Sequence, residues 1–303
     1  MEGQPKSSFL EPLKQVYETK YKLLMFITIG LLIFSLGVLA YQKATTGEFI
    51  QKDVSLKGGL MVQLQTDRQF DTEQLAGQIS KELGVTANVK SLSALAGQPL
   101  GYTIELEKTN SKTALAAIEK ITGVPSSTYT VEESSSTLSE SFFRSVVKSI
   151  VIAFVFMSAM VFLYFKLPFR SFAVILAGFS DLIETIALMQ IFGIKLSTGG
   201  VAALLMLIGY SVDADILLSA RVLKQQHTST MDAIYSSIKT GLTMQITAVA
   251  ALAVLYIATP AAMLKQISII LIIGLCVGML NAWIQNAGLL RIYLDWRKEH
   301  GRA

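Results

Sequence analysis

The chain has 303 residues, of which 52% are hydrophobic and only 16% are charged. Ordinary soluble domains carry roughly 25% charged residues, so this composition excludes an ordinary soluble protein and indicates that much of the chain faces lipid. The formal net charge of +4 is too small to indicate nucleic-acid binding, and we expect no nucleic acid among the partners.

The first apolar segment covers residues 23–41 and follows a short basic stretch, residues 1–22, that we expect to be cytoplasmic. A cleaved signal peptide has an apolar region of only about 7–15 residues. This segment is longer, and as a helix it is long enough to cross the ~30 Å hydrocarbon core of a bilayer. The sequence therefore favours an uncleaved transmembrane helix over a signal peptide.

Residues 42–145 are polar in composition and predict a domain outside the bilayer. Residue alternation, helical periodicity and capping residues predict four strands and two helices. The strands are predicted at residues 59–66, 86–92, 102–107 and 128–132, and the helices at residues 71–83 and 109–121. The order β-α-β-β-α-β is that of a ferredoxin-like α+β domain. Because Cys276 is the single cysteine, this domain has to fold without an intrachain disulfide.

The rest of the chain is nearly all apolar and predicts five more transmembrane helices. They are predicted at residues 146–165, 172–192, 201–220, 242–258 and 267–290. An amphipathic segment, residues 221–241, separates the fourth span from the fifth, and a basic tail covers residues 291–303. The predicted fold class is therefore a membrane α-helical protein with about six transmembrane helices and one external ferredoxin-like domain.

Lysine and arginine predict the orientation of these helices, because cytoplasmic loops carry an excess of both. If the N-terminus is cytoplasmic, the two short external turns hold only Lys195 and Lys265. The basic residues of the cytoplasmic segments are then Lys6, Lys14, Lys20, Lys22, Lys166, Arg170, Arg221, Lys224, Lys239, Arg291, Arg297, Lys298 and Arg302. We therefore expect a multi-pass protein of the cell membrane with both termini cytoplasmic and residues 42–145 extracellular.

Four carboxyl groups interrupt the apolar spans: Asp181 and Glu184 in the third, Asp213 and Asp215 in the fourth. An aspartate at the centre of a membrane helix costs about 2.5–3.5 kcal/mol, and such residues usually face the bundle interior and mark an ion or proton path. The alternative is that they only bond a neighbouring helix. We expect the functional role foremost for Asp181 and Asp213, which lie about 15 Å and 12 Å from the cytoplasmic face.

The two fourth-span aspartates cannot both face the third span. Residues two apart point to nearly opposite sides of a regular helix, so either Asp213 or Asp215 faces Asp181, unless Gly209 and Ser211 loosen the helix. The sequence does not choose between them.

Arg221, at the cytoplasmic end of the fourth span, is a candidate counter-ion for the acids. The alternative is an ordinary positive anchor at the membrane surface. No histidine or cysteine spacing indicates metal ligands, so we expect no metal site and no cofactor.

Residues 202–221, AALLMLIGYSVDADILLSAR, resemble the signature span of the SecD/SecF family of protein-export membrane proteins. Leu56-Lys57-Gly58-Gly59 resembles the Gly-Gly motif with which that family's external domain starts. The layout of one span, an external domain and five further spans is similar to that of the SecF branch. Within the signature, Val212-Asp213-Ala214-Asp215 resembles archaeal members more than bacterial ones.

The resemblance implies a SecF-like subunit of the Sec protein-export apparatus, similar to one half of an RND-type transporter and not an enzyme. Its implied partners are SecD, the Sec translocon channel, translocating preproteins and membrane lipid. By position, Asp181 is the leading candidate for a proton relay, followed by Asp213, Asp215 and Glu184. Gly209 and Ser211 would supply helix flexibility and close packing, and Gly58 and Gly59 the external-domain motif.

Two other functions are compatible with acidic membrane spans. One is an RND-like proton-coupled transporter subunit for another substrate. The sequence shows no substrate pocket that would distinguish this function from protein export. The other is an intramembrane aspartyl protease that uses Asp181 and Asp213 as a dyad. Such proteases carry Tyr-Asp and Gly-x-Gly-Asp, whereas this chain has Ser180-Asp181 and the sequence GYSVD ending at Asp213, which makes the protease the weaker alternative.

Overall fold

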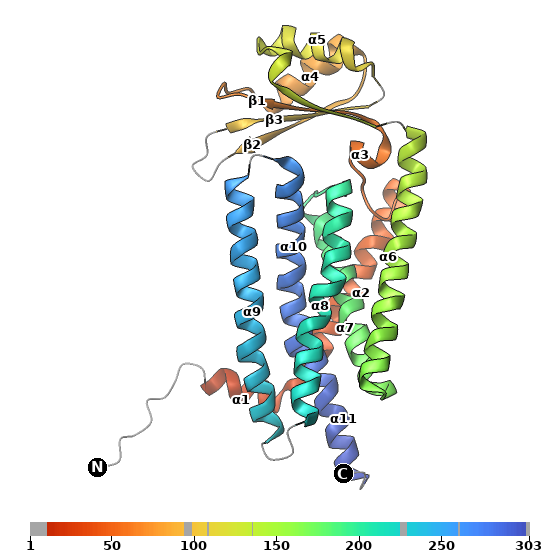
Figure 1. Ribbon diagram of the computed structural model, residues 1–303, viewed down its shortest axis with the longest axis vertical. Helices are drawn as coiled ribbons and strands as arrows, with labels where there is room; N and C mark the ends of the chain where they lie inside the picture. Colours follow the sequence, from red (N-terminus) through yellow and green to blue (C-terminus); the bar gives the residue numbers. More distant parts are fainter. Residues whose placement is uncertain are drawn as a thin grey trace, which may run out of the picture.

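The computed structural model describes residues 11–93, 99–107, 109–134, 136–224, 229–259 and 261–300. The outer parts of the predicted cytoplasmic ends, residues 1–10 and 301–303, lie outside the described residues. Figure 1 shows a tall helical bundle that carries a small α+β domain at one end. The short helix α1 (Glu11–Thr19) and the last helix, α11 (Ala287–Glu299), lie at the opposite end.

Among the described residues, six helices are long and apolar enough to cross a membrane, which confirms the predicted membrane fold. The spans are formed by α2 (Tyr21–Thr46), α6 (Ser136–Phe165), α7 (Pro168–Ile191), α8 (Thr198–Lys224), α9 (Thr230–Ala258) and α10 (Ala262–Leu280). The last span continues from α10 through a π-helical segment, η2 (Asn281–Asn286), into α11. The sixth predicted span is therefore helical throughout but not one regular α-helix.

Several helices are longer than the apolar segments that predicted them. The helix α6 begins at Ser136, inside the range predicted as external domain, and α2 continues to Thr46. The predicted amphipathic segment 221–241 is not a separate unit, because its two ends belong to α8 and α9. Hydropathy identifies only the part of a helix that lies in lipid. The helix itself extends further, because its backbone hydrogen bonds continue through polar residues at the membrane interface.

The external domain is a four-stranded antiparallel sheet with strand order β2-β3-β1-β4, which confirms the ferredoxin-like prediction. Its elements are α3 (Val54–Lys57), β1 (Gly59–Gln65), α4 (Thr72–Leu83), β2 (Ala87–Ser93), β3 (Pro99–Leu106), α5 (Ser111–Thr122), η1 (Ser126–Thr128) and β4 (Tyr129–Ser134). Figure 1 shows α4 and α5 on the face of the sheet that points away from the bundle. Leu64, Ile79, Ile104 and Ile118 are fully buried between sheet and helices.

The Gly58-Gly59 pair lies where α3 meets β1. Gly58 has a φ of 88° and ends α3, a left-handed conformation that glycine adopts without steric cost. A Cβ on Gly59 would lie 2.4 Å from the carbonyl oxygen of Leu106 on β3, which is closer than two such atoms can approach. Both glycines are thus required by backbone geometry at the base of the external domain.

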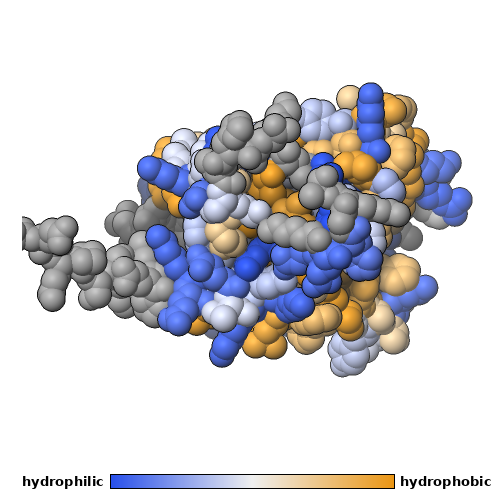
Figure 2. Space-filling model, turned by 90° about the horizontal axis from the view of Figure 1, so that it is seen from below, coloured by the Kyte–Doolittle hydropathy of each residue, from blue (hydrophilic) through white to orange (hydrophobic). Residues whose placement is uncertain are grey.

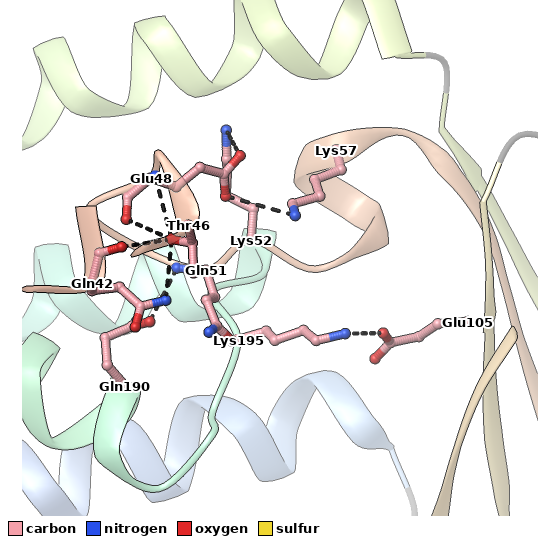
Figure 3. Close-up of polar contacts among 9 residues, drawn as sticks. All are labelled: Gln42, Thr46, Glu48, Gln51, Lys52, Lys57, Glu105, Gln190 and Lys195. Atoms are coloured by element: carbon pink, nitrogen blue, oxygen red, sulfur yellow. Dashed lines mark hydrogen bonds and ion pairs between the residues drawn. The ribbon is translucent and has the colours of Figure 1, made fainter. Parts of the chain in front are cut away.

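The external domain is tied to the turn between α7 and α8 by a buried carboxylate. Figure 3 shows Lys195 extending from this turn toward Glu105 on β3, with its Nζ 2.9 Å from Oε2. Lys90 approaches Oε1 of the same group at 3.1 Å. Burial by itself would raise the pKa of Glu105, but the charges and hydrogen bonds of Lys90 and Lys195 outweigh it and hold the pKa below its ordinary value.

Backbone contacts reinforce this junction. Leu196 donates to the carbonyl of Gln51 at 2.7 Å and accepts from the N–H of Asp53 at 2.9 Å. Asp53 caps α3 by accepting from the N–H and the hydroxyl of Ser55, and the Ser55 hydroxyl accepts from the N–H of Thr198 at the start of α8. Burial raises the pKa of Asp53 to about 6.

A cavity of about 430 Å³ separates the rest of the sheet from the outer ends of α9 and α10. It is lined on the sheet side by Met61 and Thr103 and on the bundle side by Tyr256 and Gln266. The external domain therefore rests on the bundle mainly through α3 and the α7–α8 turn.

Candidate functional site

The acidic residues lie on the helices at the centre of the bundle. More than half of the apolar part of α7, α8 and the last span is buried within the chain, whereas α6 and α9 are mostly exposed. The predicted relay residues come from α7 and α8. The site is therefore enclosed by this chain's own helices on the side of α10 and η2.

Asp181 is almost completely enclosed, with 2% of its surface exposed. The hydroxyl of Ser211 on α8 donates to its Oδ2. The side-chain amide of Asn281 donates to Oδ1 at 2.8 Å and also to Oε2 of Glu184 at 3.0 Å. Gly278 permits this approach, because a Cβ there would lie only 3.3 Å from Oδ2 of Asp181.

The structure resolves which fourth-span aspartate faces inward. Asp215 is completely buried, and Asn286 donates to its Oδ1 at 2.8 Å. Asp213 is exposed on the outer surface of α8. Of the two aspartates between which the sequence left the choice open, Asp215 is therefore the one that faces inward. The helix is continuous through Ser211, and residues two apart consequently point to opposite sides.

The amide donors come from η2, which sequence reasoning missed. The N–H of Ala287 donates to the carbonyl of Ala282, five residues earlier, which is the bond of a π-helix. Residues five apart point about 140° away from each other on an α-helix, so the π-helical segment is what turns Asn281 and Asn286 toward the same cluster. Their signal in the sequence was present, since Asn281, Gln285 and Asn286 are three carboxamides in an otherwise apolar span.

The cluster contains more acceptors than donors. Five buried oxygen atoms have no hydrogen-bond donor within the part of the chain that the structure describes. They are Glu184 Oε1, Asp215 Oδ2, Asn281 Oδ1, Gln285 Oε1 and Asn286 Oδ1. Burying an unpaired polar group costs free energy, and a carboxyl group becomes a donor when it is protonated. Protons held on the carboxyl groups would therefore add hydrogen-bond donors to a site that is short of them.

Two further predicted residues have other roles in the structure. Arg221 donates to the carbonyl and hydroxyl of Ser236 at 2.8 and 3.0 Å and to the hydroxyl of Thr240 at 2.9 Å. Among the described residues, these hydrogen bonds of Arg221 tie α8 to α9 and do not go to the acids. Gly209 is exposed, and a Cβ on it would meet nothing within 4 Å, so it makes no close helix contact within this chain.

The chemistry available to the cluster is the holding and transfer of protons. The described residues contain no group of three or more histidine, cysteine, aspartate or glutamate side chains arranged to hold a metal ion. The dyad of Asp181 and Asp213 that a protease would need is not formed, because Asp213 points outward. Fold and site together define a multi-pass membrane protein with carboxyl groups inside its bundle and one external α+β domain.

Comparisons with known proteins agree with this class. The family described as protein export membrane protein SecD/SecF, C-terminal, matches residues 114–296. The protein-export membrane protein SecF of Pyrococcus furiosus is 35% identical over 291 residues, which cover 93% of this chain and 97% of the relative. SecF of Methanocaldococcus jannaschii is 33% identical and covers 90% and 96%. The chain therefore belongs to the SecF family of protein-export membrane proteins, and its relatives include the archaeal members that the sequence resembled.

Solved structures share the fold. The crystal structure of SecDF, a translocon-associated membrane protein from Thermus thermophilus, matches with a TM-score of 0.73 at 16% identity. The match covers 96% of this chain but only 39% of the SecDF chain. SecDF in a super-membrane-facing form matches with a TM-score of 0.58 at 18% identity and covers 100% and 41%. This chain thus spans about two fifths of the length of those proteins.

Proposed function

We propose that this chain is a SecF-type subunit of the Sec protein-export apparatus that uses the proton gradient to promote preprotein translocation. Asp181, Glu184 and Asp215 would take up and release protons inside the bundle. The external domain would respond by moving against the membrane. Family membership supports the export role, and the buried cluster supports the use of protons.

The shortage of donors in the cluster is the observation that carries the proton hypothesis. Asp181 and Asp215 are both almost inaccessible, and two carboxylates close together in a low dielectric cannot both ionise at low cost. A protonated carboxyl group supplies a donor to the cluster, whereas an ionised carboxyl group only accepts hydrogen bonds. The gain or loss of a proton alters the hydrogen bonding between α7, α8 and η2.

The junction with the external domain supports the transmission of that change. The turn between α7 and α8 carries Lys195 and Leu196, which hold Glu105 and the backbone of residues 51–53. A shift between the two acid-bearing helices would therefore reach the external domain directly. The cavity beside the junction leaves space in which the sheet can tilt.

The exposed face of α8 supports a membrane partner, which we propose to be SecD. Met206, Gly209, Tyr210 and Asp213 form one exposed stripe at helical spacing. An aspartate left in lipid at the centre of a helix costs about 2.5–3.5 kcal/mol, and a partner helix with a hydrogen-bond donor would remove that cost. The SecDF structures, of which this chain covers 39% and 41%, support a second half supplied by another subunit.

The proposed orientation puts both termini in the cytoplasm and the external domain outside the cell. Figure 2 views the end of the bundle that carries α1 and α11 and shows many hydrophilic side chains gathered on it. Basic residues of the described chain at this end include Lys20, Lys22, Lys166, Arg170 and Arg291. Positive charge on one face of a membrane protein favours the cytoplasmic side. The Sec translocon channel and translocating preproteins would then be met on the outer side.

Export in vesicles reconstituted with SecD and the translocon tests the proposal. Asp181→Asn keeps the size of the side chain and removes the titratable group, and we expect loss of the gradient-dependent stimulation of export while insertion and SecD binding persist. Asp295→Asn, which changes a carboxyl group in the cytoplasmic helix α11, is the matched control and should export normally. Normal gradient-dependent export by Asp181→Asn would refute the relay. Co-purification with solute-transport partners and never with SecD would favour a transporter of another substrate.

A further inference from the structure

A backbone carbonyl of η2 accepts a hydrogen bond from the cytoplasmic helix α1. In a regular α-helix the N–H of Ala287 would donate to the carbonyl of Trp283, four residues earlier. It donates instead to Ala282 and Ile284, and the carbonyl of Trp283 accepts the hydroxyl of Tyr17 at 2.7 Å. The hydroxyl of Tyr17 therefore donates to the carbonyl of Trp283, which does not accept from the N–H of Ala287 in the π-helical geometry.

The side chain of Trp283 is fixed from the other side by α9. Its ring is 5% exposed, and its Nε1 donates to Oε1 of Gln245 at 3.1 Å. The ring packs on Gly241, where a Cβ would lie 2.1 Å from its Cζ2. Any larger residue at position 241 would push the ring away. Trp283 is thus held at its carbonyl by α1 and at its indole by α9.

The helix α1 is itself docked by several polar contacts. Arg291 donates to the carbonyls of Tyr17 and Glu18 at 3.1 and 2.8 Å. The hydroxyl of Tyr235 donates to Oε1 of Glu18 at 2.8 Å. Burial raises the pKa of Tyr17, so its hydroxyl keeps the proton that it donates to Trp283.

We propose that Tyr17 and Trp283 are positioning residues for the buried carboxyl cluster. By fixing η2 between α1 and α9, they hold the amides of Asn281 and Asn286 against Asp181, Glu184 and Asp215. The docking of a cytoplasmic helix thereby sets the hydrogen bonding of carboxyl groups inside the membrane. The inference rests on the proposed function for the use of these carboxyl groups, but the positioning itself is a statement about geometry.

Infrared difference spectroscopy of the full-length protein in lipid bilayers tests the inference. The carboxyl bands of Asp181 and Asp215 are assigned by their loss in Asp181→Asn and Asp215→Asn. We expect Tyr17→Phe, which removes one hydroxyl and keeps the ring, to shift these bands. Tyr235→Phe removes a hydroxyl of α9 that bonds Glu18 of the same docked helix without touching η2, and should leave them in place. Unshifted bands in Tyr17→Phe, or equal shifts in both variants, would overturn the inference.

A second variant acts on the opposite side of the same residue. Gly241→Ala displaces the indole of Trp283, and we expect it to shift the same bands. Gly37→Ala adds the same methyl group to α2, where a Cβ meets nothing within 4 Å, and should have no effect on them. Bands that stay in place in Gly241→Ala would also contradict the inference. Because the readout does not depend on export, shifted bands in Tyr17→Phe together with normal export by Asp181→Asn would refute the relay and leave the positioning intact.

Discussion

Asn281 donates its side-chain amide to the carboxyl group of Asp181 at 2.8 Å in the interior of the bundle. The same nitrogen lies 3.0 Å from Glu184, so a single amide joins two acids one helical turn apart on α7. Asn281 is therefore a donor that both acids of α7 share.

Asn281→Leu should destabilise the protein. The substitution removes one donor from two buried carboxyl groups, and hydrogen bonds to charged groups contribute about 1.5–3 kcal/mol each. We expect the thermal unfolding midpoint in detergent to fall, with a loss of roughly 3–6 kcal/mol in the free energy of unfolding for the two bonds together. Gln78→Leu, at an exposed position of α4, is the control. Equal midpoints for Asn281→Leu and the wild type would contradict this role.

Glu105→Gln should loosen the external domain from the bundle. The carboxylate pairs with Lys195 and Lys90, and its neutral analogue leaves both cations without that charge. Hydrogen exchange at residues 192–197 and 51–53 should accelerate. Glu82→Gln changes an ion pair on the exposed surface, where such pairs contribute little, and should leave the exchange unchanged.

The lowered pKa of Glu105 gives the junction a pH dependence. A carboxyl group whose pKa is depressed in the folded protein stabilises it fully above the ordinary value of about 4.3. That contribution is lost as the pH falls through the folded pKa. The wild-type junction should therefore become less protected as the pH falls below about 4, whereas Glu105→Gln should lack this change.

Asp53 should give α3 a pH dependence opposite in sign to that of Glu105, and Asp53→Asn should remove it. Because burial raises the pKa of Asp53 to about 6, the folded protein binds this proton more tightly than the unfolded chain does. Its contribution favours the folded state below about 3.9 and is lost as the pH rises through the folded value, a difference of roughly 2–3 kcal/mol. Asparagine keeps the cap on α3. The protection of the α3 backbone amides from hydrogen exchange, corrected for intrinsic exchange rates, should fall between pH 4 and pH 7 in the wild type. It should stay level in Asp53→Asn. A parallel fall in both proteins would refute the assignment.

Tyr210 should contact the membrane partner. A photo-crosslinking phenylalanine analogue at this position lies on the exposed stripe of α8 beside Asp213, and we expect it to capture SecD in native membranes. The same analogue in place of Phe34, which is exposed on α2, is the control and should capture lipid. Capture of SecD from position 34 and not from position 210 would place the partner on another face.

The sequence predicted the architecture well, because each of its signals has a local physical cause. Apolar length marked the spans, and Asp71 and Gly84 marked the ends of α4, where the structure has the expected caps. The carboxyl groups at Asp181 and Asp215 were visible as charges that lipid rejects.

The rotation of α8 and the path of η2 were not predictable in the same way. The helix α8 is apolar on all sides, since one side meets lipid and the other meets protein, so hydropathy carries no information about which aspartate points inward. The π-helical segment changes the phase of the last span, and its carbonyl at Trp283 contacts Tyr17, which lies far away in sequence. Periodicity read along one helix cannot detect such a contact.

Proton flux through the reconstituted complex with SecD tests the central claim most directly. Vesicles that contain a pH-sensitive dye would be given a proton gradient during preprotein translocation. We expect internal acidification with the wild-type chain and with Asp295→Asn, and its loss in both Asp181→Asn and Asp215→Asn. Undiminished proton flux in the double variant Asp181→Asn/Asp215→Asn would contradict a proton path through the buried cluster.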